Sequence, residues 1–292
     1  MPIDELAVRQ AAMAYVGECR DSSGGTITRA QLEAFGFDGR PLKLIDTGRG
    51  IRNPAELAAT LTIMSSPQGP YDDVETPDGL IRYAYRAGDP NGGDNRKLRR
   101  AAELGLPLIL LQKVDDGVFV PVFPVYLVND DPDERFVEVA VDESLRFLAG
   151  TQVTEDQRRY AERLTKLRLH QPVFRAQVIA AYDRMCAICR LKHVDLLDAG
   201  HILNDAAGGQ PVVTNGISLC KIHHAAYDRD ILGIRPDYVI EIRAEVLLEV
   251  DGPMLRHGLQ EVHGWNLELP ARKADRPDQA GLHVRWEAFS GR

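Results

Sequence analysis

The chain has 292 residues, of which 44% are hydrophobic and 27% charged, so it is long enough for two domains with a core each. Its net charge of −8 excludes a uniformly basic nucleic-acid binder, because neutralisation of phosphates supplies most of such affinity. Any DNA-binding surface has to be local, and the basic clusters at 96–100 and 158–168 are either such surfaces or solvated helix faces. No run approaches the roughly 18 apolar residues of a membrane helix, and the N-terminus is not basic, so we expect a soluble, cytoplasmic protein.

Helices are predicted in three places in the first third of the chain. Good helix formers with an apolar face predict a helix over residues 4–20. Thr28 and Gln31 have the spacing of a capping box, which predicts a second, short helix that begins there. A third helix is predicted over 96–104, where Gly105 ends it.

Short apolar runs typical of strands dominate the region between residues 42 and 141. The predicted strands are 42–45, 80–85, 108–114, 118–123 and 136–141. The turn Asp115-Asp-Gly117 between two of them favours a hairpin. This pattern predicts a compact, β-rich first domain with a few helices.

The second half of the chain begins with a charged segment, 143–169, whose helix-forming residues predict a connecting helix. An amphipathic helix then begins at Pro172, a strand is predicted over 238–243, and scattered apolar residues near the C-terminus are expected to pack onto the second domain. The expected organisation is a first domain at 1–145, a connecting helix at 146–170 and a second domain at 171–292.

Three of the four cysteines lie close together in the sequence. Cys186-Ala-Ile-Cys189 is followed about thirty residues later by Cys220-Lys-Ile-His223, a spacing typical of a tetrahedral structural zinc site. Thiolate and imidazole are ligands that zinc prefers. We therefore expect Cys186, Cys189, Cys220 and His223 to hold a structural Zn²⁺, and Cys19 to be a buried thiol.

Residues of nuclease type stand between and beside these ligands. They lie in the segments Leu196-Leu-Asp-Ala-Gly-His-Ile202, Thr214-Asn-Gly-Ile-Ser-Leu-Cys220 and His223-His-Ala-Ala-Tyr-Asp228. Together these segments resemble the HNH family of ββα-metal nucleases in its zinc-knuckle branch, over about 170 to 250. The resemblance implies that His201 is the general base, that His224 holds a catalytic Mg²⁺ or Mn²⁺, and that Asn215 fixes the hairpin loop or reaches the metal.

One position departs from that family. Many of its members have a metal ligand directly before the base, where this chain has Gly200. Asp198 is the nearest carboxylate, but in a regular strand it points to the opposite face from His201, so it would ligate only indirectly or through a bulge. Asp228 follows His224 by one helical turn and shares its face, which makes it the better geometric candidate, although it is equally consistent with a structural carboxylate.

A second resemblance lies in the first domain. Residues 69–74, 83–88, 94–98 and 105–109 resemble, in this order, the SRA domain, a PUA-like β-barrel that flips modified cytosine out of DNA; the match covers about 40 to 130. A flipped base requires aromatic rings to stack on and a carboxylate to accept a hydrogen bond from its amine. The resemblance implies Tyr71 and Tyr85 as the stacking pair, with Asp73 or Asp72 at the base edge. Tyr83 has the strand parity of Tyr85 and is an alternative stacking residue.

The two resemblances together predict an α+β protein with an N-terminal PUA/SRA-like β-barrel domain followed by a ββα-metal HNH domain with a zinc knuckle. The implied function is a modification-dependent restriction endonuclease that acts on double-stranded DNA carrying 5-methylcytosine or a related base. A homodimer is expected because cutting both strands requires two active centres. Two alternatives remain: an HNH nuclease that acts on unmodified DNA, and a noncatalytic protein that binds modified DNA.

Overall fold

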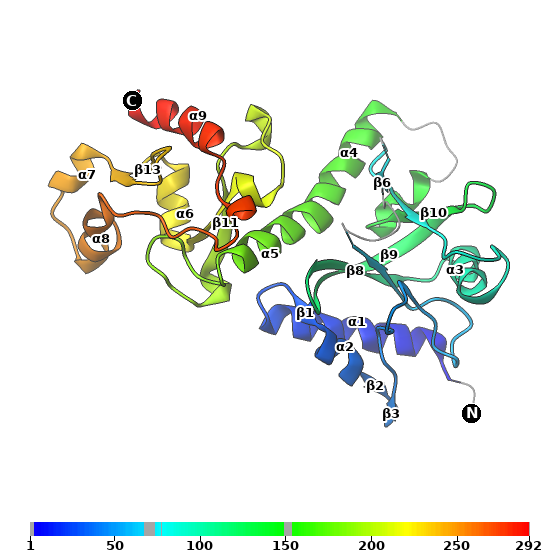
Figure 1. The fold of residues 1–292 in the computed structure, drawn as a ribbon. Helices are drawn as coiled ribbons and strands as arrows, with labels where there is room; N and C mark the ends of the chain where they lie inside the picture. Colours follow the sequence, from blue (N-terminus) through cyan, green and yellow to red (C-terminus); the bar gives the residue numbers. More distant parts are fainter. Residues whose placement is uncertain (1–2, 67–73, 77, 149–153, 292) are drawn as a thin grey trace. The chain divides into compact units, whose positions relative to one another are not determined.

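The computed structural model describes residues 3–66, 74–76, 78–148 and 154–291, and the chain divides into two compact units, Met1–Val173 and Phe174–Arg292 (Figure 1). Each unit has its own hydrophobic core. Within the described residues, no helix combines the length and the apolar character that crossing a membrane requires.

The first unit is built from a mixed sheet, several helices and a short hairpin. Its helices are α1 (Glu5–Ser22), α2 (Arg29–Ala34), α3 (Gly93–Leu104) and α4 (Glu155–Thr165), with a 3₁₀ turn at Glu143–Leu148 and a π-helical turn at Lys166–His170. The strands of the sheet are β1 (Ile27–Thr28), β4 (Ile51–Arg52), β5 (Thr62–Ser65), β6 (Val74–Glu75), β7 (Ile81–Ala84), β8 (Leu108–Asp115), β9 (Val118–Asp131) and β10 (Phe136–Ala140); β2 (Gly36–Phe37) pairs with β3 (Arg40–Pro41). The predicted helices and the capping box of Thr28 with Gln31 are confirmed.

The long strand β9 joins the two halves of the sheet. The order of the strands is β4-β5-β8-β9-β10-β7-β6, and β1 also pairs with β9. The first part of β9 pairs with β8 and the last part with β10, so one strand serves both halves and the sheet curls. Only β5 and β8 are parallel; the other neighbours are antiparallel.

Strand β8 shows why the sheet has a core on each face. Its residues Leu108, Ile109, Leu110 and Leu111 are all buried, although successive side chains of a strand point in opposite directions. Leu108 and Leu110 pack into the core that contains residues of α3 and α4, whereas Ile109 and Leu111 pack with α1 and α2. The helices α1 and α2 lie on one side of the sheet and α4 on the other (Figure 1). A continuous apolar run is the pattern that such a doubly covered strand requires.

The first unit is thus a mixed α+β unit with a curled sheet. The expected PUA/SRA-like barrel stays a prediction. The sheet ends at β4 on one side and at β6 on the other, and among the described residues these two strands do not pair with each other.

The prediction of a strand over 42–45 was wrong. Leu42, Leu44 and Ile45 are buried, as an apolar run should be, but they lie outside the sheet. Their backbone bonds explain the difference: the amide of Leu42 donates to the carbonyl of Phe35, and that of Leu44 to the carbonyl of Leu32. The segment is therefore tied to α2 and its C-terminal end instead of to a neighbouring strand.

The second unit consists of short elements around one core. Its helices are α5 (Gln171–Ala181), which begins in the first unit, α6 (Lys221–Asp228), α7 (Ala244–Leu248), α8 (Pro253–Gly258) and α9 (Gln279–Ser290). Its strands are β11 (Leu197–His201), β12 (Gly216–Cys220), β13 (Leu232–Ile234) and β14 (Ile240–Ile242), which form two antiparallel pairs, β11-β12 and β13-β14.

The pair β11-β12, with α6 directly after it, carries most of the residues singled out by the sequence. Its register places Leu197 opposite Cys220 and His201 opposite Gly216. Every residue of β12 is buried, and Leu197 belongs to the same core as Ile217 and Leu219. The ββα order β11-β12-α6 is the arrangement that the expected fold requires.

Candidate active site

The four expected zinc ligands form one cluster. The ligand atoms of Cys186, Cys189, Cys220 and His223 all lie within 4.8 Å of one another. His223 Nδ1 lies 3.4 Å from Cys186 Sγ and 3.3 Å from Cys220 Sγ, and the Sγ atoms of Cys189 and Cys220 are 4.0 Å apart. With Zn–S bonds of about 2.3 Å and Zn–N bonds of about 2.0 Å, a tetrahedral site puts its ligand atoms roughly 3.5–3.8 Å apart. The cluster therefore has the size and the donor set of a zinc site.

The orientation of the His223 ring also fits a zinc ligand. Its Nε2 donates to the carbonyl of Gly258 at 2.8 Å, which leaves Nδ1 directed at the sulfur atoms. A metal-binding histidine commonly donates its other N–H in this way, because that bond fixes the tautomer and the ring orientation. Burial alone would lower the pKa of His223, but the thiols of Cys186 and Cys220 raise it to about 10.

His201 ends strand β11 and is held against helix α5. Its ring stacks on Phe174, with ring centroids 4.2 Å apart and an interplanar angle of 22°. Its partner across the hairpin is Gly216, where an added Cβ would lie 2.4 Å from Val178 and 2.9 Å from Phe174. Glycine at that position therefore lets α5 approach the hairpin closely enough for Phe174 to reach His201.

Asn215 fastens the loop that connects the two strands. Its Oδ1 accepts from the amide of Leu203 at 2.9 Å, and its Nδ2 donates to the carbonyls of Leu203 and Gln210, each at 2.9 Å. Its own carbonyl accepts from the amide of Ile202 at 3.0 Å. The bonds to Ile202 and Leu203 are made directly after His201, so Asn215 fixes the backbone that follows this side chain.

An Asn215→Ala variant is expected to lower the free energy of unfolding of the second unit by about 1–3 kcal/mol, because its partners around Leu203 lose their bonds in a largely buried place. Both tryptophans of the chain, Trp265 and Trp286, lie in this unit, so their fluorescence during urea unfolding measures it directly. Asn266→Ala, at an exposed asparagine of the same unit, is the matched control. Equal unfolding midpoints for the two variants would contradict this role of Asn215.

His224 lies between two carboxylates. Its Nδ1 is 3.3 Å from Asp198 Oδ2, and its Nε2 is 3.4 Å from Asp228 Oδ2. A neutral imidazole has only one N–H, so it satisfies one of these carboxylates and turns a lone pair toward the other. A cation between Nε2 and Asp228 would remove that conflict. Neighbouring ligands of an octahedral Mg²⁺ are about 3 Å apart, since its bonds are about 2.0–2.1 Å long, so the residues present fit such an ion.

Asp198 is already engaged by cations of the protein. Both of its oxygens accept from Lys221 Nζ at 2.7 Å, and Arg175 Nε lies 3.7 Å from Oδ1. Partial burial opposes ionisation, but the hydrogen bonds from Lys221 and His224 outweigh it and hold the pKa of Asp198 below its usual range. By contrast, the Asp228 side chain is 57% exposed. Of the two carboxylates, Asp228 is therefore the one accessible to an added metal ion.

Gly200 provides the space that His224 occupies. A Cβ at this position would lie 3.2 Å from Cδ2 and 3.6 Å from Nε2 of His224, and 3.1 Å from Leu219. Asp198 and Gly200 share the face of β11 that is turned toward α6, whereas His201 lies on the face turned toward Phe174. The imidazole of His224 therefore occupies the space that a side chain at position 200, directly before His201, would take.

The residues expected to bind a modified base fall into two groups. Tyr71, Asp72 and Asp73 lie outside the described residues. Tyr83 and Tyr85 belong to the core of the first unit: the hydroxyl of Tyr83 donates to the carbonyl of Gly50, and Tyr85, only 2% exposed, donates to Asp130. Burial is also the main cause of the raised pKa of Tyr85. A flipped base would reach either ring only if this core opened.

Sequence reasoning missed the residues that position the expected ones. The helix predicted from Pro172 assigns no contact to Phe174, and the sequence pattern does not indicate Arg175 or Lys221 as partners of Asp198. The register of the hairpin indicates the contact of Lys221 with Asp198. Asp198 lies opposite Leu219, and the long side chain of Lys221, two residues after Leu219, can reach Asp198 diagonally.

A comparison with protein families matches part of the second unit. Residues 186–235 match the HNH endonuclease family, which makes this part of the chain an HNH endonuclease domain. The matched range includes the four residues of the cysteine and histidine cluster. It also includes His201, Asn215, His224 and Asp228. No curated protein matches the chain.

Two solved structures are similar in part. One is described as a modification-dependent restriction endonuclease, TagI; it is 17% identical with a TM-score of 0.30, and the match covers 82% of this chain and 85% of the other. The second is described as a Type IV phosphorothioation-dependent restriction endonuclease, ScoMcrA; it is 17% identical with a TM-score of 0.25, and the match covers 61% of this chain and 51% of the other.

Proposed function

We propose that this protein is a metal-dependent DNA endonuclease directed to DNA that carries modified cytosine. The observation that carries the nuclease part is the HNH match over 186–235, which includes the hairpin β11-β12 and helix α6 with their histidines. The modification dependence rests on the resemblance of the first domain to SRA readers and on the need of an HNH centre for a separate targeting domain.

In this proposal His201 takes the proton from the attacking water. Imidazole suits this role because its pKa lies near neutrality. Stacking on Phe174 restricts rotation of the His201 ring, and Asn215 holds the backbone that follows it. Phe174 and Asn215 are therefore positioning residues. They keep the His201 ring in one orientation while a flexible DNA backbone approaches.

His224 and Asp228 hold the catalytic Mg²⁺ or Mn²⁺. When bound, the ion supplies positive charge that stabilises the scissile phosphate and the leaving 3′ oxygen. Asp198 accepts the Nδ1 proton of His224 and so keeps Nε2 available as the ligand atom, as a carboxylate partner of a metal-binding histidine does. Lys221 balances the charge of Asp198, which leaves Asp228 as the carboxylate that approaches the ion.

The first unit is proposed to be the reader. A base pocket formed by Tyr71 with Asp73 or Asp72 would provide a stacking ring and a carboxylate acceptor. Tyr85 and Tyr83 join that pocket only with a rearrangement of the core in which they are buried. Their burial also favours the second candidate, an HNH nuclease whose first unit does not read modifications.

Cleavage of one plasmid prepared with cytosine, 5-methylcytosine or 5-hydroxymethylcytosine tests the proposal. We expect faster cleavage of at least one modified plasmid in Mg²⁺ or Mn²⁺ than of the unmodified one. Tyr71→Ala is expected to reduce this preference while zinc content stays the same, and Tyr160→Ala, at an exposed tyrosine of the first unit, serves as the control.

Each other outcome supports a different alternative. Equal cleavage of all three plasmids would favour the nuclease that acts on unmodified DNA. No cleavage of any plasmid in either metal, with binding retained, would favour a noncatalytic binding protein. A homodimer is part of the proposal, because a double-strand cut near one site requires two centres, and sedimentation of the protein with and without DNA measures it.

A further inference from the structure

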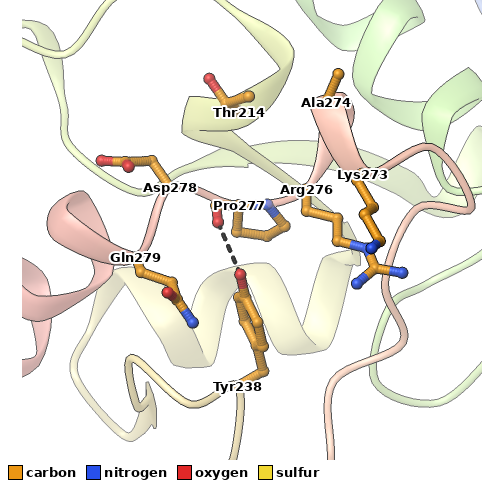
Figure 2. Close-up of a pocket in the computed structure, with 8 residues that line it drawn as sticks. All are labelled: Thr214, Tyr238, Lys273, Ala274, Arg276, Pro277, Asp278 and Gln279. Carbon is orange, nitrogen blue, oxygen red and sulfur yellow. Dashed lines mark hydrogen bonds between the residues drawn. The ribbon is translucent and has the colours of Figure 1, made fainter.

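The segment that precedes helix α9 is fastened to the catalytic hairpin. The amide of Asp278 donates to the carbonyl of Thr214 at 2.9 Å, one residue before Asn215. The hydroxyl of Tyr238 donates to the carbonyl of Pro277 at 3.1 Å (Figure 2). In the first turn of α9, a Cβ added to Gly281 would lie 3.5 Å from Ile202. This segment therefore packs against both ends of the loop that follows His201.

A pocket of about 440 Å³ opens at this place. Its lining residues are Thr214, Tyr238, Lys273, Ala274, Arg276, Pro277, Asp278 and Gln279. In Figure 2 the charged ends of Lys273 and Arg276 lie on the same side of the pocket, whereas the carboxylate of Asp278 points to the other side. The pocket thus has a cationic wall within the HNH domain's own unit.

The carboxylates near this wall have other partners. Asp275 pairs with Arg272 at 3.5 Å, and Asp278 accepts from the amide of Gly281 at 2.8 Å as the cap of α9. Within the described part of the chain, no carboxylate forms an ion pair with Lys273 or Arg276. Two cations that line one pocket without an anion raise its positive potential, and a bound anion would be attracted to both.

Several guanidinium groups in the other basic clusters of the chain have carboxylate partners. Arg99 pairs with Asp130 at 2.7 Å, and Arg168 pairs with Asp142. Arg158 pairs with Asp78 at 3.1 Å. These guanidinium groups therefore stabilise the first unit, which makes them weaker candidates for a DNA contact than a pair of cations that no carboxylate neutralises.

We propose that Lys273 and Arg276 bind a backbone phosphate of DNA beside the catalytic hairpin, as a phosphate-binding wall that sets the path of the strand next to the scissile bond. This inference rests on the proposed nuclease function and deepens it. Phosphate is the group that a nuclease substrate presents at every nucleotide, and an ammonium and a guanidinium are the side chains that bind it most strongly. In a chain of net charge −8, such contacts have to be local.

The salt dependence of DNA binding tests this wall. The binding of a fluorescein-labelled DNA duplex containing 5-methylcytosine is measured by anisotropy over a series of salt concentrations, with every variant built on His201→Ala so that the DNA stays intact. Lys273→Ala and Arg276→Ala are each expected to weaken binding and to reduce the slope of log K against log salt by about 1, because each removes one phosphate contact. Lys273→Arg, which keeps the charge, should restore the slope.

The matched control is Arg256→Ala, which removes one positive charge from an exposed arginine of the same unit that pairs with Glu261. If Lys273→Ala and Arg276→Ala have the slope and affinity of Arg256→Ala, the wall does not bind DNA. Lys273 is exposed, so loss of folding does not complicate its variant. Cleavage by the wild-type protein is measured in parallel. If the wild type cleaves DNA but the salt slopes of the two variants do not change, only the phosphate-binding role of Lys273 and Arg276 is overturned. If the salt slopes fall but the wild type does not cleave, only the proposed nuclease function is overturned.

Discussion

A Cys186→Ser variant is expected to lose its zinc and to unfold the second unit, while the first unit keeps its fold. Structural zinc in small domains contributes about 10–16 kcal/mol of apparent binding free energy at neutral pH, which is as large as the whole stability of a typical domain. Cys186 is fully buried in the core of the second unit and its Sγ lies 3.4 Å from His223 Nδ1, so its loss affects both the ligand set and the packing.

Zinc content, tryptophan fluorescence and limited proteolysis measure the result. Because Trp265 and Trp286 both lie in the second unit, a red-shifted emission reports its unfolding, and a protease-resistant N-terminal fragment reports a folded first unit. Cys19→Ser is the matched control, since Cys19 lies in α1 of the first unit, outside the cluster. A wild-type protein that purifies without zinc, or a Cys186→Ser variant with native emission, would show that the cluster does not hold the unit together.

The cluster was predictable from the sequence because its ligands come from two short turns with fixed spacing. Each pair of ligands, Cys186 with Cys189 and Cys220 with His223, has only two residues between its members, so local geometry brings its two atoms together. The amide of Ala187, between the first two ligands, donates to the carbonyl of Ser218 in β12 at 2.7 Å, and β12 ends at Cys220, so the two pairs are held together. Little tertiary information was needed for this site.

The failed strand over 42–45 shows what the apolar pattern leaves open. Burial of Leu44 is predictable from its neighbours, but a buried apolar run does not determine which backbone groups it pairs with. Here the amide of Leu44 donates to the carbonyl of Leu32, and its carbonyl accepts from the hydroxyl of Thr62 at 2.6 Å. The first partner depends on the position of α2 and the second on the position of β5, and a local sequence pattern determines neither.

The two described tyrosines illustrate a related gap. Alternation in β7 and after it correctly places Tyr83 and Tyr85 on one face. The same alternation does not distinguish a face that lines a ligand pocket from one that packs in a core. The partner that decides this for Tyr85 is Asp130, which lies 45 residues away and reaches it because β10 pairs with both β7 and β9.

For the expected catalytic metal site, the sequence pattern placed two carboxylates near His224 but did not give their other partners. Helical spacing placed Asp228 beside His224, and strand parity placed Asp198 away from His201. The distances of 3.3 Å and 3.4 Å put the two carboxylates on opposite nitrogens of His224. The engagement of Asp198 by Lys221, which separates an orienting carboxylate from an accessible one, follows only from the packing of α6 on the hairpin.

A His201→Ala variant is expected to cleave DNA about 100- to 10,000-fold more slowly than the wild type, the range that a general base contributes. Its zinc content and DNA affinity should stay unchanged, because His201 lies outside the cluster and ends a strand whose loop Asn215 holds independently. Single-turnover cleavage of a plasmid that the wild type cuts measures the rate. Free imidazole in the buffer should restore part of it, since the variant leaves a space beside the Phe174 ring that an imidazole fits.

Two comparisons separate a base from a residue that merely supports the fold. His283→Ala, at an exposed histidine of α9, removes an imidazole from the same unit and should cleave at the wild-type rate. His224→Ala should also be slow, but imidazole in solution should not rescue it in the same way, because its place is packed against Gly200 and fixed between Asp198 and Asp228. Wild-type cleavage by His201→Ala would rule out its role as the base. A slow variant that has also lost zinc would instead assign His201 to the stability of the hairpin, since a base is needed only for the chemical step.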